Sequence, residues 1–340
     1  MKKKDVRSMK LTMQLKSRSY DIILKAGCLA NLHQFTNVAN RKVFVLTDSG
    51  VPAEYAQTVA AQCPDSTVYT IPRGEGSKCL KVYGQVLQAM LAFGMDRKDL
   101  LVSVGGGVVG DLGGFCAASY MRGIDFVNCP TTVLSQVDSS IGGKTAIDLG
   151  ETKNFVLVDF DTLKTLPRRQ VVNGLAEALK TGIIGDPQLF ALFECEHPED
   201  NIEQIVYRSL KFKKKIVEQD EREGSVRACL NFGHTIGHGI EAVRGVRGRR
   251  TTGLYHGECV ALGMLPMIED TALLKRTRAI YRALGLPTRA GANKKKVLAY
   301  MQHDKKARGD HITVIKCPGL GCWRADSLPM TELPALLGME

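Results

Sequence analysis

Residues 99–114 read Asp-Leu-Leu-Val-Ser-Val-Gly-Gly-Gly-Val-Val-Gly-Asp-Leu-Gly-Gly, in which an apolar, partly β-branched run passes directly into glycines. The run ending at Val104 predicts a fully buried strand of a parallel sheet. The glycines after it allow backbone N–H groups at the start of a helix to approach a phosphate closely. Their spacing departs from Gly-x-Gly-x-x-Gly, and a turn of this kind is purely structural about as often as it binds a ligand. Both interpretations stay open on this stretch alone.

On either side of this stretch, short β-branched runs alternate with helical spacing of apolar residues. Lys42–Asp48 and Phe126–Pro130 predict two further strands, and Leu80–Phe93 predicts a helix. From about Leu166 onward longer helical patterns dominate, over Val171–Thr181, Ile202–Glu218, His234–Val243 and Gly257–Arg282. The sequence therefore predicts an α/β N-terminal domain with a Rossmann-like, largely parallel sheet over residues 1–165, and a mostly α-helical C-terminal domain over residues 166–340.

The composition is that of an ordinary globular protein, with 340 residues, 44% hydrophobic and 24% charged. No apolar run approaches the roughly 20 residues that a membrane span requires. The basic start, Met-Lys-Lys-Lys, is not followed by an apolar region, so no secretory signal is expected. The ten cysteines form no Cys-x-x-Cys pair and are interpreted as reduced thiols of a cytoplasmic protein.

The net charge of +11 favours anionic partners, and nucleic acid is one class to consider. The basic clusters are not interleaved with aromatic residues, and no nucleic-acid module signature is present; they are Lys2–Lys4, Lys211–Lys215, Arg244–Arg250 and Lys294–Lys296. Solvated faces explain most of them. A small substrate with several negative charges would use a few, so we expect no nucleic acid and no membrane as partners.

Three of only seven histidines lie close together in the sequence. His234 and His238 are four residues apart, so on a helix they share one face. His256 opens a second helical pattern, and Glu177 lies on an acidic helix upstream. Two imidazoles and one carboxylate from separate helices make a catalytic zinc set with an open fourth position. The alternative is that these are ordinary surface or capping histidines.

Polar residues at strand ends favour a dinucleotide near the glycine turn. Asp48 ends one strand and is suited to a ribose hydroxyl, and Thr131 and Thr132 end another. Basic residues near the histidine pattern suit a substrate that carries carboxylate and phosphate. They are Lys180, which shares a helix face with Glu177, and also Lys213 and Arg227, with Lys144 near the glycine turn of residues 137–145.

Eight motifs together closely resemble the 3-dehydroquinate synthase family, in order over nearly the whole chain. They are Gly105–Asp111, Tyr120–Gly123, Pro130–Thr132, Val137–Thr145, Thr165–Pro167, Gly174–Lys180, Leu230–His238 and His256–Glu258. Related sugar-phosphate cyclases share the glycine loop and the metal set, whereas Val137–Thr145 resembles the dehydroquinate branch. Glycerol dehydrogenase-like enzymes are a more distant match.

The resemblance implies roles for individual residues. The metal ligands would be Glu177, His234 and His256. The catalytic group would comprise His238, Asp138, Lys144, Asn154 and Lys180. Substrate would be held by Lys213, Arg227, Asn231 and Lys306, with Arg122 reaching the phosphate across a dimer. NAD would be held in the N-terminal domain by Asp48, Glu75, Lys78, Gly106, Gly107, Val108, Asp111, Thr131, Thr132, Lys144, Lys153, Thr162 and Thr165.

The same resemblance implies a cytoplasmic homodimer of the shikimate pathway, which supplies aromatic amino acid biosynthesis. As a carbon–oxygen lyase acting on phosphates, it would convert 3-deoxy-D-arabino-heptulosonate 7-phosphate to 3-dehydroquinate and phosphate. It would use NAD that is regenerated in each turnover and a divalent metal, Zn²⁺ or Co²⁺. Two other functions stay open: an NAD- and metal-dependent polyol dehydrogenase of the glycerol dehydrogenase type, and either a catalytically weak homologue or a non-enzymatic basic protein that binds nucleic acid.

The chain departs from the family pattern in two places. Between Asn154 and Thr165 the family carries a longer connection with an Ile-Gly-x-Phe-x-Gln-Pro stretch, which is absent here. Gln170 stands where the family pattern has Glu. The first departure predicts an altered wall near the nicotinamide and therefore altered NAD affinity.

Overall fold

The computed structural model describes residues 8–16, 19–142, 154–221, 223–245, 253–302, 307–308 and 310–339. The chain forms two compact units, Met1–Pro167 and Arg168–Glu340. The sequence analysis placed the division between residues 165 and 166. Each unit is described separately below.

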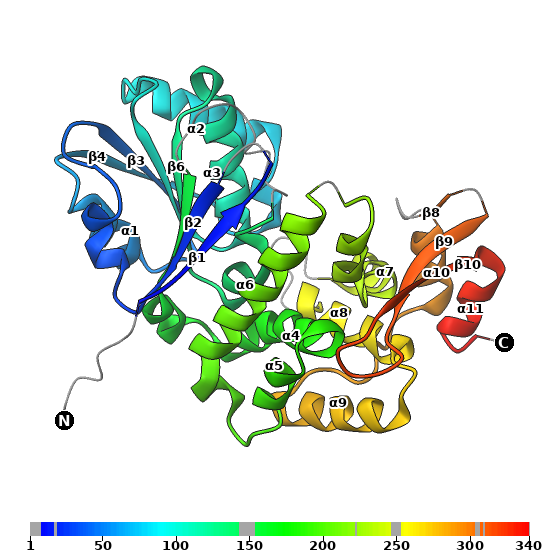
Figure 1. Cartoon of the computed structure of the whole chain (residues 1–340). Coiled ribbons are helices and arrows are strands. Elements are labelled where there is room, and N and C mark those ends of the chain that lie inside the picture. The colour runs from blue at the N-terminus through cyan, green and yellow to red at the C-terminus, as the bar shows by residue number, and fades with distance from the viewer. Residues whose placement is uncertain are drawn as a thin grey trace. The chain divides into compact units, whose positions relative to one another are not determined.

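The N-terminal unit is built on a largely parallel sheet (Figure 1). Its described strands are β1 (Met9–Gln14), β2 (Ser19–Leu24), β3 (Lys42–Asp48), β4 (Asp65–Ile71), β5 (Leu100–Gly105), β6 (Asp125–Pro130) and β7 (Asn154–Val158), and they lie in the order β1-β2-β7-β6-β5-β3-β4. Only β1 and β2 pair antiparallel, at one edge; the other neighbours run parallel. The expected α/β fold with a parallel sheet is confirmed.

Helices cover both faces of this sheet. They are α1 (Ala53–Ala60), α2 (Leu80–Ala92) and α3 (Gly107–Ser119), with short helical turns η1 (Leu29–Gln34), η2 (Glu75–Ser77), η3 (Tyr120–Arg122), η4 (Ser135–Ser139) and η5 (Phe160–Thr165). Successive side chains of a strand point to opposite faces. Val43 and Val45 therefore join the core beneath η1 and α1, whereas Phe44 and Leu46 join the core beneath α2 and α3.

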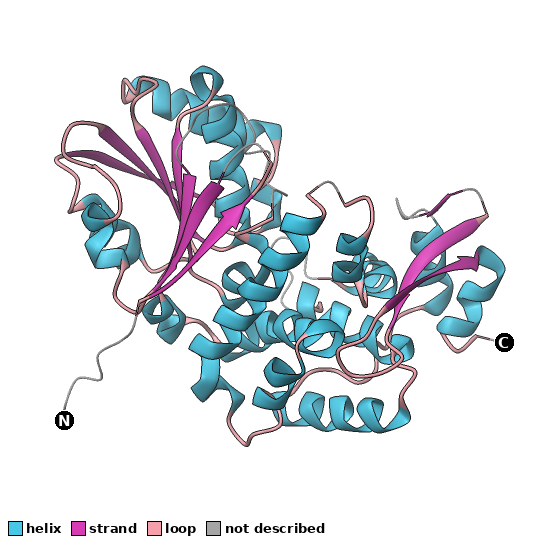
Figure 2. Ribbon diagram, in the orientation of Figure 1, coloured by secondary structure: helices cyan, strands magenta, loops and turns pink. Residues whose placement is uncertain are grey.

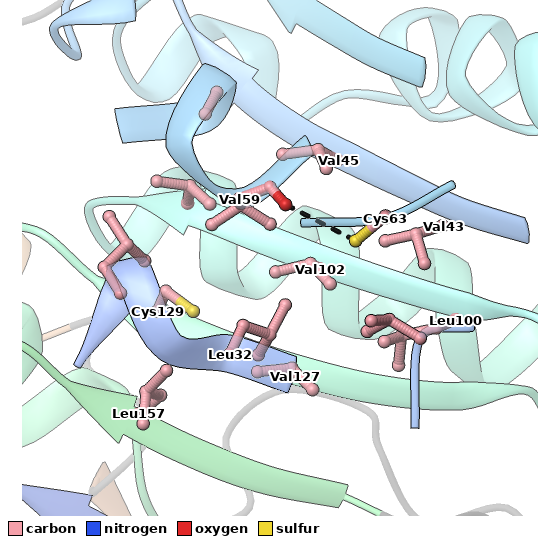
Figure 3. Packing of buried hydrophobic residues seen from close by; sticks show 14 of the residues in the cluster. Leu32, Val43, Val45, Val59, Cys63, Leu100, Val102, Val127, Cys129 and Leu157 are labelled. Carbon is pink, nitrogen blue, oxygen red and sulfur yellow. Dashed lines mark hydrogen bonds between the residues drawn. The ribbon is translucent and has the colours of Figure 1, made fainter. Parts of the chain in front are cut away.

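The packing on the first of these faces is visible in Figure 3. Leu32 of η1 and Val59 of α1 lie against the valines of β3 and against Val102 of β5 and Val127 of β6. All of these side chains are fully buried. The β-branched runs that identified the strands are therefore the residues that hold the helices on the sheet.

The C-terminal unit is mostly helical, as expected, and also contains a small sheet (Figure 2). Its elements are α4 (Arg168–Gly185), α5 (Pro187–Leu192), η6 (Pro198–Asn201), α6 (Ile202–Gln219), η7 (Val226–Asn231), α7 (His234–Arg244), α8 (His256–Met264), η8 (Leu265–Met267), α9 (Thr271–Leu284), α10 (Lys294–Gln302), β8 (Ala307–Arg308), β9 (His311–Lys316), β10 (Arg324–Pro329), η9 (Met330–Glu332) and α11 (Leu333–Leu336). The antiparallel sheet, in the order β10-β9-β8, was not anticipated.

The single long helix expected over Gly257–Arg282 is wrong. The segment forms α8, a short turn η8 and then α9, which begins at Thr271. Pro266 has no N–H for a continuing helix, so the α-helix ends before it. Asp270 starts the next helix, because its Oδ1 accepts a hydrogen bond of 2.7 Å from the backbone N–H of Leu273.

None of the described helices is both long enough and apolar enough to cross a membrane.

Candidate active site

Three helices of the C-terminal unit approach one another closely because glycines line their contacts. A Cβ at Gly257, in the first turn of α8, would lie 1.9 Å from the backbone oxygen of Asn173 on α4. A Cβ at Gly263 would lie 2.0 Å from the backbone oxygen of Gly233, just before α7. No other residue type fits at either position without moving the backbone. The glycines thereby bring the start of α8 close to α4 and the end of α8 close to the start of α7.

This packing brings Glu177 of α4, His234 of α7 and His256 of α8 together. Glu177 Oε1 lies 3.4 Å from His256 Nε2 and 3.7 Å from His234 Nε2. Ligand atoms bound to zinc at about 2.0–2.2 Å in a tetrahedron lie roughly 3.3–3.5 Å apart. Both distances from Glu177 are therefore close to the separations that one zinc ion imposes.

Each of the two imidazole rings is oriented through its other nitrogen. His234 Nδ1 lies 3.1 Å from the backbone oxygen of Phe232, and His256 Nδ1 lies 3.0 Å from Glu241 Oε2. A carbonyl and a carboxylate only accept hydrogen bonds, so both Nδ1 atoms carry the hydrogen. Both Nε2 atoms consequently face Glu177.

Charge at this cluster is unusual for a buried site. Burial alone would raise the pKa of the Glu177 carboxyl, but Lys180, followed by His234 and His256, holds that pKa well below its ordinary value. Burial, with Lys180 as the next cause, lowers the pKa of His234 well below its ordinary value. Burial opposes the charged form of His256, yet hydrogen bonds to Glu177 and Glu241 raise its pKa to about 10. The carboxylate is therefore charged and His234 is neutral, which are the forms that bind metal.

The cluster passes a chemical test as a metal site. Glu177 is buried, and its Oε1 lies between the Nε2 atoms of His234 and His256, while its Oε2 pairs with Lys180. A buried carboxylate that shares its free oxygen with two imidazole nitrogens has the arrangement of a metal ligand. A carboxylate with two imidazoles is a donor set that divalent zinc or cobalt accepts.

His238 also belongs to this cluster. Its ring nitrogen and those of His234 and His256 all lie within 4.8 Å of one another, a group able to hold an ion by itself. The sequence analysis placed His238 outside the metal set. The geometry brings it next to that set, on the same face of α7 as His234.

The same unit buries three cations that the sequence analysis named. Lys180, Lys213 and Arg227 are all almost completely buried. Lys180 Nζ donates a 2.7 Å hydrogen bond to the backbone oxygen of Leu230, which ties α4 to η7. Cations are rarely buried without a functional or structural partner, and Lys180 has one in Glu177, whose Oε2 lies 2.7 Å from its Nζ.

The loop before η7 contains a residue that the sequence analysis missed. Glu223 has a left-handed backbone with φ of 58°, which is unusual for a residue other than glycine. Its Oε1 accepts a 2.7 Å hydrogen bond from Asn231 Nδ2. Such strain concentrates at functional sites. No sequence signal marked Glu223, because its backbone angle is set by the fold of the loop.

In the N-terminal unit, the expected cofactor residues gather where the strand order reverses. The chain proceeds from β3 outward to β4 and then returns to β5 on the other side of β3. Asp48 ends β3, and the glycine turn follows β5 and starts α3 at Gly107. Dinucleotides bind at such switch points of open α/β sheets. Thr131 continues the same edge, its N–H donating to the backbone oxygen of Gly105 over 2.9 Å.

Three other expected cofactor residues contact one another. Lys78 Nζ lies 2.7 Å from Asp111 Oδ2 and 2.9 Å from Glu75 Oε1. Lys78 and Asp111 also line a pocket of about 350 Å³, whose other walls include Tyr83 and Phe115. A largely apolar pocket with a few polar groups is a common setting for a small-molecule ligand.

The remaining expected residues of this unit are held in place by the fold. Thr162 Oγ1 donates to the backbone oxygen of Asp159 over 2.7 Å, and Thr165 Oγ1 lies 2.8 Å from Tyr55 Oη. A Cβ at Gly106 would meet Thr132 Cγ2 at 3.2 Å, so the turn lies against that threonine. Val108 packs on the core, Asp138 lies in η4 and Asn154 begins β7. Lys144, Lys153 and Lys306 lie outside the described residues.

Comparison with known proteins identifies the family. A model described as 3-dehydroquinate synthase N-terminal matches residues 68–173, and one described as 3-dehydroquinate synthase C-terminal matches residues 174–307. The curated 3-dehydroquinate synthase of Streptococcus suis (strain 05ZYH33) is 37% identical, over 96% of this chain and 98% of that protein. The chain belongs to the 3-dehydroquinate synthase family. The resemblance found in the sequence motifs is confirmed.

Solved structures of related cyclases share the fold. A 2-deoxy-scyllo-inosose synthase complexed with carbaglucose-6-phosphate, NAD⁺ and Co²⁺ has a TM-score of 0.82 at 21% identity, covering 98% of this chain and 100% of that chain. The 2-epi-5-epi-valiolone synthase from Streptomyces hygroscopicus subsp. jinggangensis 5008, with NAD⁺ and Zn²⁺ bound, has a TM-score of 0.80 at 26% identity, covering 95% and 97%. The range of this chain that the C-terminal family model matches contains Glu177, His234 and His256.

Proposed function

We propose that the chain catalyses the conversion of 3-deoxy-D-arabino-heptulosonate 7-phosphate to 3-dehydroquinate and phosphate. The family membership supports this reaction. The observation in the structure that carries the proposal is the joining of Glu177, His234 and His256 in a unit that also buries three cations, Lys180, Lys213 and Arg227.

In this proposal Glu177, His234 and His256 hold a divalent metal, Zn²⁺ or Co²⁺. NAD is held in the N-terminal unit by Asp48, the Gly106–Val108 turn and the Lys78–Asp111 pair, and by the other cofactor residues named from the sequence. When bound, NAD accepts and returns a hydride, and the metal polarises the hydroxyl that is oxidised. The chain's own groups do the remaining work.

The charged side chains bind and orient a substrate that carries a carboxylate and a phosphate. Lys213, Arg227 and Asn231 are the substrate-binding groups in this proposal, and Lys180, paired with Glu177, belongs to the catalytic group. Fixed cations in a water-poor setting stabilise developing negative charge without moving. His238, beside the metal set and on the same face of α7, transfers protons.

Arg122 has a different setting in the N-terminal unit. It is exposed at the tip of η3, and both it and Met121 have left-handed backbones, with φ of 69° and 48°. The unusual backbone of these two residues holds the Arg122 side chain in an exposed position. In the proposed cytoplasmic homodimer, Arg122 binds the phosphate of the substrate in the neighbouring subunit. Its exposed position is consistent with this role.

Phosphate release from the heptulosonate phosphate tests the proposal. We expect phosphate release to require NAD and a divalent metal. No net NADH should accumulate, as measured by absorbance at about 340 nm, because each NADH returns its hydride before product leaves. Glu177→Gln, which keeps the side-chain shape, should abolish phosphate release. Stoichiometric NADH from a polyol without phosphate release would contradict the proposal in favour of a polyol dehydrogenase, and steeply salt-dependent DNA binding without turnover would contradict it in favour of a basic binding protein.

A further inference from the structure

A second carboxylate contacts the histidine of α8. Glu241 lies on α7, seven residues after His234 and therefore on the same face of that helix. Its Oε2 is 3.0 Å from His256 Nδ1, while the opposite nitrogen of that ring, Nε2, is 3.4 Å from Glu177 Oε1. The imidazole of His256 is thus held at both ends by carboxylates from two different helices.

The two carboxylates differ in burial, which separates their roles. Glu177 is 1% exposed, whereas the side chain of Glu241 is 38% exposed. A partly exposed ion pair contributes little to folding, at most about 1 kcal/mol. Folding stability is therefore a poor explanation for placing Glu241 against this ring.

The direction of the contact supplies a better explanation. Because a carboxylate only accepts, His256 Nδ1 carries the hydrogen and Nε2 is directed at the metal set. His234 obtains the same orientation from a backbone oxygen, that of Phe232, which is fixed by the main chain. The Nδ1 of His256 is instead oriented by a side chain, that of Glu241 on α7.

The backbone of His256 is held independently of Glu241. Arg169 of α4 forms two hydrogen bonds with Glu258, of 2.7 and 2.8 Å, and Glu258 Oε2 also accepts from the backbone N–H of Tyr255 over 2.8 Å. The start of α8 is thereby tied to α4. These contacts fix the main chain and leave the rotation of the imidazole ring to Glu241.

We infer that Glu241 is a positioning residue, which sets the tautomer and the ring orientation of His256 for metal binding. The inference rests on the proposed function only in taking Glu177, His234 and His256 as the metal ligands. Replacing a residue that hydrogen-bonds to a metal ligand typically changes metal affinity by about 10- to 100-fold.

The test is a Co²⁺ titration of the metal-free full-length protein, followed by calorimetry and by the visible absorption of the bound ion. Glu241→Ala should weaken Co²⁺ binding by about 10- to 100-fold. Glu241→Gln should lose less, because its amide oxygen still accepts from Nδ1. Glu196→Gln is the matched control: it removes one negative charge from the same unit at a side chain that is 90% exposed and far in sequence from the ligands.

Thermal unfolding of the metal-free variants separates positioning from a structural role. We expect the metal-free Tm of Glu241→Ala to stay within about 4 °C of the parent, since less than about 1 kcal/mol is lost. Unchanged Co²⁺ affinity in Glu241→Ala would overturn the inference, as would a loss of metal-free stability large enough to account for the weaker binding.

Glu177→Gln distinguishes failure of the Glu241 inference from failure of the proposed function. If the parent binds Co²⁺ and Glu177→Gln does not, the metal set stands and the Glu241 variants alone decide the inference. If Glu177→Gln binds Co²⁺ as the parent does, or if the parent binds none, the proposed metal set and the role of Glu241 are both overturned.

Discussion

Lys180 Nζ lies 2.7 Å from Glu177 Oε2, and the two side chains are only 3% and 1% exposed. They are three residues apart on α4, one above the other on the same face. A buried ion pair of this kind keeps the carboxylate charged when no metal is bound. Removing one partner of such a pair typically costs about 3–5 kcal/mol, because the other charge is left without compensation.

Lys180→Met should therefore destabilise the metal-free protein by about 3–5 kcal/mol. A divalent metal on Glu177 restores the compensation, so we expect Zn²⁺ to raise the Tm of Lys180→Met by more than it raises the Tm of the parent protein. The measurement is Tm with and without Zn²⁺ for both proteins. An equal Zn²⁺-induced shift in both would show that the metal does not bind at Glu177.

Metal content should separate His256 from His238. The protein should bind about one divalent ion per chain, and chelation should abolish turnover until Zn²⁺ or Co²⁺ is restored. We expect His256→Ala to purify without metal. We expect His238→Ala to retain metal but to lose about 10²-fold or more in turnover, as a proton-transfer residue does. Loss of metal from His238→Ala would instead favour coordination by the three histidines.

Substitutions at the glycine turn should weaken NAD binding without changing the metal content. In Gly106→Val the new side chain meets Thr132, because a Cβ alone would already lie 3.2 Å from its Cγ2. We expect weaker NAD binding in calorimetry for this variant and for Asp111→Ala, with unchanged metal content. Gly84→Ala on α2 is the control, since a Cβ there meets nothing within 4 Å. Metal loss from either NAD variant would contradict the separation of the two sites between the units.

Three strands could be predicted from the sequence because they are buried on both faces. The predicted strand Lys42–Asp48 has the bounds of β3, and β5 and β6 begin or end within one residue of expectation. Residues 65–71 of β4 were not recognised, since this edge strand is half exposed and its residues Asp-Ser-Thr-Val-Tyr-Thr-Ile show no long apolar run. Edge strands give a weaker pattern because only one side of the strand is paired.

The site was predictable where residue type alone limits the chemistry. The histidines and Glu177 suggested the candidate metal set, and the family motifs suggested cofactor and substrate residues in both units. Glu241 could not be found in this way, because a glutamate on a helix is usually solvated. Its partner His256 lies fifteen residues later on another helix, and only packing brings the two together.

Acid should remove the stabilisation that Asp220 contributes to the loop before Arg227. Burial works against the charged form of Asp220, but hydrogen bonds from the backbone N–H groups of Arg227, Gly224 and Ser225 lower its pKa to about 2. The folded pKa lies below the ordinary value, so its stabilisation is present above about pH 4 and is lost as the pH falls through about 2. We expect Asp220→Asn to be less stable than the parent at pH 6, by at most about 2 kcal/mol. In urea unfolding of the metal-free proteins, this difference should shrink towards pH 2; a constant difference would contradict the role of the charge.

The shortened connection near Asn154 leads to the last prediction. The motifs suggest restoring the family's Ile-Gly-x-Phe-x-Gln-Pro stretch between Asn154 and Val158, but these residues form β7, which pairs with β2 on one side and β6 on the other. An insertion within β7 would interrupt an interior strand of the sheet, so we place the test insertion at the start of the strand, directly ahead of Asn154.

We expect that insertion ahead of Asn154 to tighten NAD binding and to raise turnover, because in the family the stretch belongs to the wall near the nicotinamide. Metal content and the binding of a phosphate analogue should not change, since their proposed residues lie on other segments. The measurement is an NAD titration by calorimetry on the parent and on the insertion variant. An insertion of equal length made of glycine and serine is the control for loop length, whose entropic cost is small. Equal NAD affinity in all three proteins would mean that the connection is dispensable, as surface loops often are.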